Sequence, residues 1–236
     1  TAIGRGSKSL QVNSIAIGTS SNANNINAIA IGSAASAKQV NTIALGRNSQ
    51  ANQDTSISIG KDSVANQQNT IAFGTGAHAN TTQSIAVGQS ANANSSSSVA
   101  IGRSANAGRG GSFPNSVAIG TYANANNINA TSLGTSANAS QQNTISIGTS
   151  SRAISANAIA IGANADSESS QSISIGRDSR ASGSSSVSVG YHPDATGTDS
   201  VAIGNSSQST SSNTIAIGGS SSATQQNSIS IGASTR

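Results

Sequence analysis

Two histidines, His78 and His192, are the side chains of this sequence best suited to acid–base or metal chemistry. His192 lies in the run Tyr191-His192-Pro193-Asp194, whereas His78 stands in a stretch of small and polar residues. Neither has companions that resemble a catalytic triad or a metal-ligand set, and the chain has no cysteine. Serine is so frequent that a chance grouping of Ser, His and Asp carries little weight. We therefore predict no catalytic, cofactor-binding or metal-binding residues and no enzyme activity.

The composition argues against two further classes of function. Aromatic residues make up 2% of the chain and charged residues 8%, with a net charge of +4 from 11 Lys+Arg against 7 Asp+Glu. Nucleic-acid-binding proteins usually combine a basic patch with stacking aromatics, and both signals are weak here. The sequence also has no run of about 18 or more apolar residues. We predict neither a nucleic-acid partner nor direct membrane insertion.

A motif close to Ser-Ile-Ala-Ile-Gly recurs along the whole chain. Its glycines are Gly4, Gly18, Gly32, Gly46, Gly60, Gly74, Gly88, Gly102, Gly120, Gly134, Gly148, Gly162, Gly176, Gly190, Gly204, Gly218 and Gly232. Neighbouring motif glycines are 14 residues apart, except that Gly102 and Gly120 are separated by 18. Four extra residues therefore lie near 108–114. We expect one domain over residues 1–236 that contains 17 motif copies.

Each repeat contains two alternating segments separated by turn residues. Before the glycine, two large aliphatic residues enclose a small one, as in Ile15-Ala16-Ile17, and this period of two is typical of a β-strand. After the glycine, two small residues enclose a polar one, as in Ala91-Asn92-Ala93. Asparagine is frequent five residues before the glycine and tolerates the left-handed backbone of a turn. The pattern predicts an all-β parallel solenoid with 14-residue rungs and two short strands per rung.

We expect the large side chains of the first strand to point inward against the small residues of the second. Packing large against small residues fills a thin core to native density. The predicted core residues are Ile15, Ile17, Ile29, Ile31, Ile43, Ile57, Ile59, Ile71, Ile101 and Ile119. The first strand then presents only Ala and Ser outward, which suggests close cover by a second copy of the chain. The predicted interface residues are Ala16, Ala30, Ala44, Ala72, Ala86, Ala100 and Ala118. This reasoning leaves the number of copies open.

The outward residues of the second strand are expected to form columns, because residues 14 apart become neighbours in the stack. The neutral members that we predict to contact a ligand are Asn92, Asn106, Asn124 and Asn138. The charged members, which alternate in sign, are Arg152, Asp166, Arg180 and Asp194. Opposite charges on neighbouring strands stabilise a sheet, so we interpret the charged members as a structural ladder.

The four-residue insertion is the clearest irregularity in the repeat. It contains Arg109 and Phe113, which could project from the solenoid. Insertions in solenoids form loops and often binding elements. We therefore predict Arg109 and Phe113 as further candidate ligand contacts.

The repeat resembles a known family. Asn-Ser-Ile-Ala-Ile-Gly at 13–18 and Asn-Ser-Val-Ala-Ile-Gly at 115–120 are similar to the head repeat of YadA-like trimeric autotransporter adhesins, and the resemblance covers Thr1 to Arg236. It implies a left-handed parallel β-roll, a homotrimer around one axis, and display on the bacterial outer membrane through a stalk and anchor that this chain lacks. It also implies attachment to extracellular matrix proteins, host cells or abiotic surfaces, and autoaggregation of bacteria.

Three other functions are compatible with a solenoid. The first is a structural spacer without a ligand of its own. The second is a solenoid enzyme, such as a carbohydrate-active enzyme or an acyltransferase with six-residue repeats, although 14 is not a multiple of six. The third is an ice-binding protein, which needs a regular threonine array. The threonine column here, which includes Thr121, Thr135 and Thr149, is interrupted by Arg, Lys, Gln, Ala and Tyr.

Overall fold

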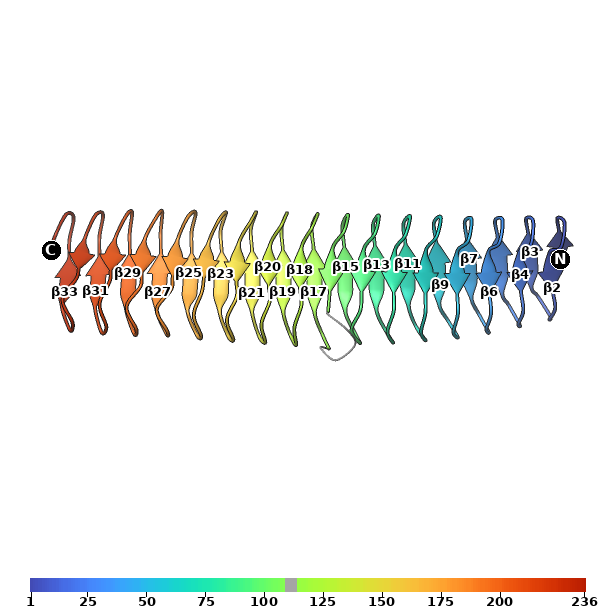
Figure 1. The fold of residues 1–236 in the computed structure, drawn as a ribbon, viewed down its shortest axis with the longest axis horizontal. Coiled ribbons are helices and arrows are strands. Elements are labelled where there is room, and N and C mark those ends of the chain that lie inside the picture. Colours follow the sequence, from blue (N-terminus) through green and yellow to red (C-terminus); the bar gives the residue numbers. More distant parts are fainter. Residues whose placement is uncertain (109–113) are drawn as a thin grey trace. The chain divides into compact units, whose positions relative to one another are not determined.

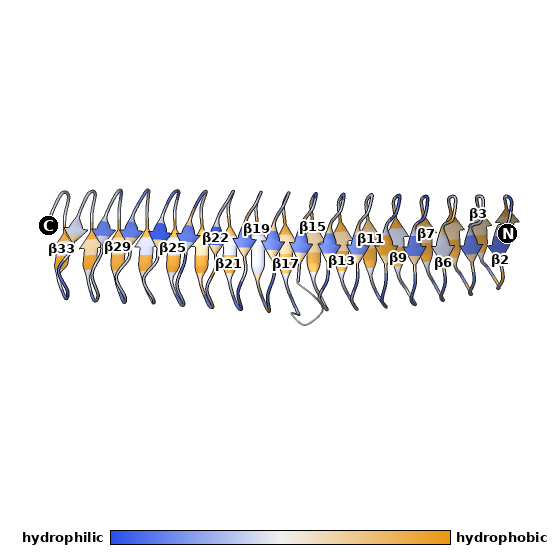
Figure 2. Ribbon diagram, in the orientation of Figure 1, coloured by the Kyte–Doolittle hydropathy of each residue, from blue (hydrophilic) through white to orange (hydrophobic). Residues whose placement is uncertain are grey.

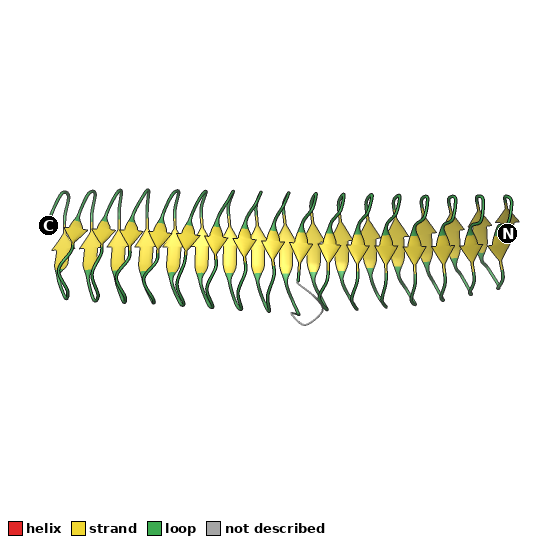
Figure 3. Ribbon diagram, in the orientation of Figure 1, coloured by secondary structure: helices red, strands yellow, loops and turns green. Residues whose placement is uncertain are grey.

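The computed structural model describes residues 1–108 and 114–236, which form two compact units, Thr1–Tyr122 and Ala123–Arg236. All the regular elements described are β-strands, and Figure 3 shows that loops connect them at both edges of two layers. This confirms the predicted all-β parallel solenoid with two strands per rung. The expectation of a single domain over residues 1–236 stays a prediction, and so does the left-handed turn of the roll.

In the unit Thr1–Tyr122, the odd-numbered strands form one sheet and the even-numbered strands form a second (Figure 1). The first sheet contains β1 (Ala2–Ile3), β3 (Ile15–Ile17), β5 (Ile29–Ile31), β7 (Ile43–Leu45), β9 (Ile57–Ile59), β11 (Ile71–Phe73), β13 (Ile85–Val87), β15 (Val99–Ile101) and β17 (Val117–Ile119). The second sheet contains β2 (Lys8–Ser9), β4 (Asn22–Ala23), β6 (Ser36–Ala37), β8 (Gln50–Ala51), β10 (Val64–Ala65), β12 (His78–Ala79), β14 (Asn92–Ala93) and β16 (Asn106–Ala107).

The unit Ala123–Arg236 repeats this arrangement. Its first sheet contains β19 (Thr131–Leu133), β21 (Ile145–Ile147), β23 (Ile159–Ile161), β25 (Ile173–Ile175), β27 (Val187–Val189), β29 (Val201–Ile203), β31 (Ile215–Ile217) and β33 (Ile229–Ile231). Its second sheet contains β18 (Asn124–Ala125), β20 (Asn138–Ala139), β22 (Arg152–Ala153), β24 (Asp166–Ser167), β26 (Arg180–Ala181), β28 (Asp194–Ala195), β30 (Gln208–Ser209) and β32 (Ser222–Ala223).

The strands pair in parallel and in register with their copies in the next rung. Ile15 pairs with Ile29, for example, which is the repeat spacing read from the sequence. The register also survives the insertion, because β15 pairs with β17 through Val99 and Val117. The four additional residues therefore do not alter the pairing of these strands. Arg109 and Phe113 lie outside the described residues.

Two corners close each rung, and both use left-handed backbone. Asn13 and Ser20 have φ angles of 57° and 58° on either side of strand β3. The predicted role of asparagine in the turn is thus confirmed. Gly18 has a φ of 126°, and a Cβ atom on it would lie 2.6 Å from the carbonyl oxygen of Gly32 in the next rung. Residues with a side chain rarely adopt this φ, and the neighbouring carbonyl leaves no space for a Cβ atom. The motif therefore requires glycine at this position.

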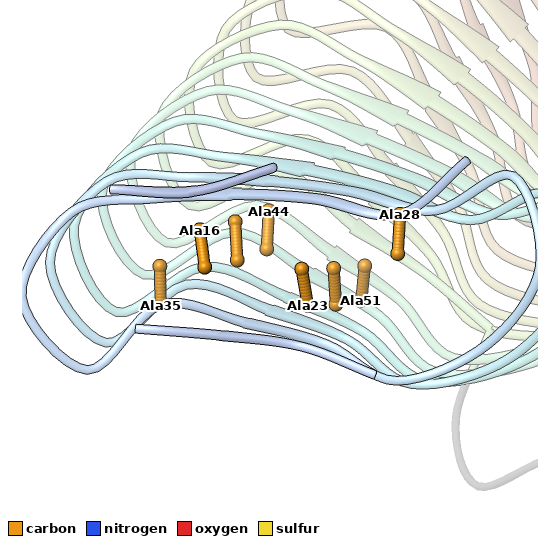
Figure 4. Packing of buried hydrophobic residues seen from close by; sticks show 8 residues of the cluster. Ala16, Ala23, Ala28, Ala35, Ala44 and Ala51 are labelled. Atoms are coloured by element: carbon orange, nitrogen blue, oxygen red, sulfur yellow. The ribbon is translucent and has the colours of Figure 1, made fainter. Parts of the chain in front are cut away.

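In the described part of the chain, mostly small side chains fill the interior between the two sheets. Ala16 and Ala44 project from one layer and Ala23 and Ala51 from the other, and all four are fully buried (Figure 4). Serine takes the alanine position in several rungs and forms hydrogen bonds across the interior. The hydroxyls of Ser146 and Ser151, for example, lie 2.7 Å apart. The core of each unit is therefore a narrow layer of Ala, Ser and Thr, which in the second unit also includes Pro193.

The predicted orientation of the first strand is wrong. Its large residues point outward and its small residues point into the interior. The residues predicted as core all point outward and are half-buried or exposed; they are Ile15, Ile17, Ile29, Ile31, Ile43, Ile57, Ile59, Ile71, Ile101 and Ile119. The residues predicted as an interface are fully buried inside the chain; they are Ala16, Ala30, Ala44, Ala72, Ala86, Ala100 and Ala118. The physical reason is the small separation of the layers, which leaves no room for an isoleucine side chain.

Candidate functional site

One outward surface of each unit is apolar. We call it the apolar face: it consists of the first and third residues of the odd-numbered strands, which Figure 2 shows as largely hydrophobic. The exposed fraction is 40% for Leu45, 52% for Phe73 and 37% for Ile101 in the first unit, and 43% for Leu133 in the second. Parallel pairing lines such residues up in continuous columns. An apolar surface of this extent in contact with water is typical of an interaction site.

The opposite surface of each unit is polar. We call it the polar face: its central column is the first residue of each even-numbered strand, and Figure 2 shows these strands as largely hydrophilic. Asn92 pairs with Asn106 in the first unit, and Asn124 pairs with Asn138 in the second. All four are half-buried or exposed. Within each unit, the structure thus brings together the asparagines predicted to contact a ligand.

A second column on the polar face of the first unit is an amide ladder that the sequence analysis missed. Nδ2 of Asn52 donates to Oδ1 of Asn66 at 2.8 Å, Asn66 donates to Asn80 at 2.8 Å, and Asn80 donates to Asn94 at 2.7 Å. These asparagines each stand six residues after a motif glycine, which was the signal available in the sequence. The ladder fixes the orientation of every amide, so the face presents donors and acceptors at regular spacing.

The polar face of the second unit carries ion pairs instead. Nη1 of Arg152 lies 3.1 Å from Oδ2 of Asp166, and Nη2 of Arg180 lies 3.1 Å from Oε2 of Glu168. Nη1 of Arg180 lies 3.8 Å from Oδ1 of Asp194. We call these five residues the charged ladder. Alternation of sign was predicted from the sequence, whereas the participation of Glu168 was not.

Burial is the largest influence on the pKa of the two aspartates of the charged ladder, Asp166 and Asp194. Partial burial raises the pKa of Asp166 above its ordinary value, although the Arg152 guanidinium opposes this effect. Partial burial also raises the pKa of Asp194, against the influence of Arg180. Oδ1 of each carboxylate is buried without a hydrogen-bond partner. Holding these carboxylates in their charged form therefore costs folding free energy.

The corner that contains His192 forms a compact cluster. The Arg177 guanidinium lies 4.3 Å from the centre of the Tyr191 ring, and that ring meets the His192 ring edge-on at 4.2 Å. Oδ2 of Asp178 lies 3.4 Å from Nε2 of His192 and 3.4 Å from Nε of Arg177. The contact between Asp178 and His192, which are 14 residues apart, ties two neighbouring rungs together.

A shallow hollow of about 490 Å³ lies on the polar face of the first unit. It is lined by Ala34, Ser36, Lys38, Asn48, Gln50, Asp62 and Val64. A hydrogen bond from Asn48, at 2.9 Å, lowers the pKa of Asp62, so the hollow carries a carboxylate as well as an ammonium group. The hollow is open because the side chains of Ala34 and Ser36 are too small to fill it.

The described residues hold no cluster suited to metal chemistry. Among residues 1–108 and 114–236, no group of three or more His, Cys, Asp or Glu side chains could hold a metal ion. His78 lies in the polar face of the first unit, between Val64 and Asn92, and His192 belongs to the second unit. Across the same ranges, none of the elements is a helix long and apolar enough to cross a membrane.

Comparison with known proteins gives one result for the whole chain. A family model described as a YadA head domain repeat of two copies matches residues 1–21, 11–35, 23–49, 37–63, 51–77, 65–91, 79–105, 114–137, 139–165, 168–192, 195–221 and 209–235. No curated protein matches the sequence. The matches cover both units and start again at residue 114 after the insertion.

Proposed function

Because the chain belongs to the YadA head family, whose repeats form the adhesin heads of trimeric autotransporters, we propose that it attaches bacteria to extracellular matrix proteins, host cells or abiotic surfaces. Proteins of this family are exposed on the outer membrane and are generally non-catalytic. We also propose that the head contributes to autoaggregation. A function in adhesion agrees with the long polar face, where the same groups recur from rung to rung.

The observation that carries this proposal is the pair of unlike faces on one thin solenoid. The apolar face exposes side chains such as Phe73 and Leu133 to water, at 52% and 43%, which a chain on its own does not tolerate well. We propose that three copies bury their apolar faces against one another around a common axis. The interface then consists of the large aliphatic residues rather than of the alanines.

Trimer formation leaves the polar faces outward, where a ligand can reach them. We propose that Asn92, Asn106, Asn124 and Asn138 belong to the ligand-contacting surface. Each contact is weak, because these side chains are small, and Asn92 and Asn106 already form side-chain hydrogen bonds within the protein. Three polar faces per trimer, each with many similar contacts, supply affinity through multivalency.

Binding of the purified head to collagen, fibronectin, laminin and bare plastic tests this function. The wild type is compared with a variant in which Asn92→Ala and Asn106→Ala remove two neighbouring amides of the polar face. The matched control is Ile85→Val, a conservative change on the apolar face of the same unit. We expect binding to at least one surface, weakened in the double variant and unchanged in the control. A stable trimer that binds none of the four surfaces would instead favour a structural spacer.

A further inference from the structure

The charged ladder of the second unit has a symmetry that its internal ion pairs do not require. Its central members occupy four consecutive rungs, because Arg152 pairs with Asp166, Asp166 with Arg180, and Arg180 with Asp194 in the parallel register. Along the solenoid the signs are plus, minus, plus, minus. Reversing the direction of the ladder exchanges every plus for a minus. The pattern is therefore complementary to its own reverse.

We propose that the charged ladder is a docking surface for the polar face of a second copy of this chain, with the two solenoid axes antiparallel. A two-fold axis midway between the rungs of Asp166 and Arg180 places Arg152 opposite Asp194 of the second copy. The same axis places Asp166 opposite Arg180. A contact of this kind is isologous, so each pairing occurs twice and the contact closes on itself.

The pattern also selects the orientation. If the two polar faces met with parallel axes in register, Arg152 would face Arg152 and Asp166 would face Asp166, and like charges at each rung repel. A parallel contact shifted by one rung leaves one charge at each end without a partner. Only the antiparallel contact pairs all four central members with opposite charges.

Neighbouring columns do not oppose this contact. The two-fold axis runs along the strand direction. A residue that lies two positions after a ladder residue therefore faces the residue two positions after that ladder residue's partner in the second copy. Glu168 then faces Ser182, next to the Arg180 guanidinium of the second copy, and Ile154 faces Thr196. On the other side of the ladder, Asp178 faces Asn164. The contact thus brings no two like charges directly together.

The ladder has capacity left for a second copy. The side chains of Arg152 and Arg180 are 50% and 49% exposed. A guanidinium offers five donors, and their internal ion pairs use few of these. Asn124 and Asn138 fill the same column with neutral amides, so the fold does not need charges at this position. Burial raises the pKa of Asp166 and Asp194, so the folded state disfavours the charged form of these two carboxylates, and docking against the arginines of a second copy offers a physical reason for their presence.

The biological consequence rests on the proposed display of the head at the cell surface. Heads that stand side by side on one cell are parallel, and their ladders repel in register. Heads from two cells that approach each other are antiparallel, and their ladders attract. The charged ladder would therefore favour contacts between cells over contacts among heads on the same cell.

Sedimentation velocity of the purified full chain tests the role of the charges. The neutral variant carries Arg152→Asn, Asp166→Asn, Glu168→Gln, Arg180→Asn and Asp194→Asn. The control variant carries Lys61→Gln and Asp62→Asn, which remove an ion pair of the first unit. We expect the wild type and the control to associate beyond the trimer at low salt. The association constant of the neutral variant should be lower by a factor of roughly ten or more. In about 1 M NaCl, where the Debye length is about 3 Å, the wild type should behave like the neutral variant.

Cross-linking tests the orientation, since the chain has no cysteine of its own. An Ile154→Cys preparation is mixed with a Thr196→Cys preparation under mild oxidation. The antiparallel contact places these positions opposite each other, so we expect the mixed disulfide to predominate over disulfides within either preparation. Equal cross-linking within each preparation would overturn the antiparallel arrangement.

Association of the neutral variant as strong as that of the wild type, or absence of association in the wild type, would overturn the docking proposal. Neither outcome affects adhesion or the trimer, because matrix binding and the trimer mass are measured separately on the same samples. Conversely, a head that binds no matrix protein can still dock through its ladder. The two proposals therefore fail by different measurements.

Discussion

The hydroxyl of Ser174 on β25 lies 2.7 Å from the hydroxyl of Ser179, which stands at the start of the opposite layer of the same rung. This contact crosses the whole interior of the roll. A fold whose two layers are joined by a single pair of serine side chains has room only for residues of this size. The interior and the apolar face therefore respond to substitution in opposite ways.

Enlarging an interior alanine should destabilise the fold. Ala86 is fully buried, and Ala86→Leu adds three carbon atoms where the layers leave no space. We expect a loss of about 1–3 kcal/mol or more in the free energy of unfolding, measured by urea denaturation at fixed protein concentration. Ala86→Ser is the matched control, because Ser132 occupies the same position in another rung and donates to the carbonyl of Ala137 at 2.7 Å. Equal stability of the two variants would contradict a narrow interior.

Introducing a charge on the apolar face should dissociate the trimer. Ile101 is 37% exposed, and three copies of Ile101→Lys would place three ammonium groups in the proposed interface. Since a buried charge without a partner is strongly unfavourable, we expect sedimentation equilibrium to give the mass of a monomer. The control is Asn92→Lys, which adds the same charge on the polar face and should leave the trimer intact. A trimer that persists in both variants would exclude the apolar face as the interface.

Replacing a motif glycine should destabilise the corner. A Cβ atom on Gly60 would lie 2.5 Å from the carbonyl oxygen of Gly74, and the φ of Gly60 is 128°. We expect Gly60→Ala to cost about 1–3 kcal/mol of stability, measured by urea denaturation. Gly76→Ala is the control: its φ of 62° is also positive, but the nearest atom lies 3.7 Å away, and Ala34 adopts a φ of 57° at the equivalent position. A near-neutral result for both variants would mean that the rungs adjust their spacing easily.

The charged ladder should give the folded state a pH dependence that follows from Asp166. Burial raises its pKa in the folded state, against Arg152 and Arg180, and with a further contribution from Glu168. The stabilisation from a raised carboxyl pKa is fully present below the unfolded pKa of aspartate and is lost as the pH rises through the folded pKa. We therefore expect the stability of the wild type relative to Asp166→Asn to decrease from acidic to neutral pH.

Thermal unfolding of both proteins across this pH range checks the prediction for Asp166. Asp54→Asn, a neutralisation at an exposed corner of the first unit, serves as the control for a general effect of charge. A difference between wild type and Asp166→Asn that stays constant with pH would show that Asp166 titrates alike in the folded and unfolded states.

The period of the fold could be read from the sequence, whereas the direction of the side chains could not be settled by size alone. The spacing of residues such as Asn13 and Gly18 predicted the rungs, the turns and the parallel register. The alternation alone allows either Ile17 or Ala16 to point inward, and the rule of packing large against small favoured Ile17, whereas the structure packs Ala16 against small residues such as Ala23. The deciding signal was that Ser14, Ala16 and the small residues of the second strand form a complete set of small side chains. Such a set fits an interior that is too thin for any large residue.

The candidate surfaces were predictable to different degrees. Columns on the second strand follow from the period, so the pairing of Arg152 with Asp166 was expected and is found at 3.1 Å. Contacts that depend on the path of a corner were not expected, such as the stacking of Arg177 on Tyr191 at 4.3 Å. Charge and polarity alone also do not specify which macromolecule meets the polar face, because amide groups bind many partners.

The uniform register has a consequence for inheritance. Since Ile15 pairs with Ile29 and Ile29 with Ile43 by the same rule, a gene that gains or loses 42 nucleotides gains or loses one whole rung without disturbing its neighbours. The length of the protein can therefore vary between bacterial lineages in whole steps while both of its surfaces keep their chemistry.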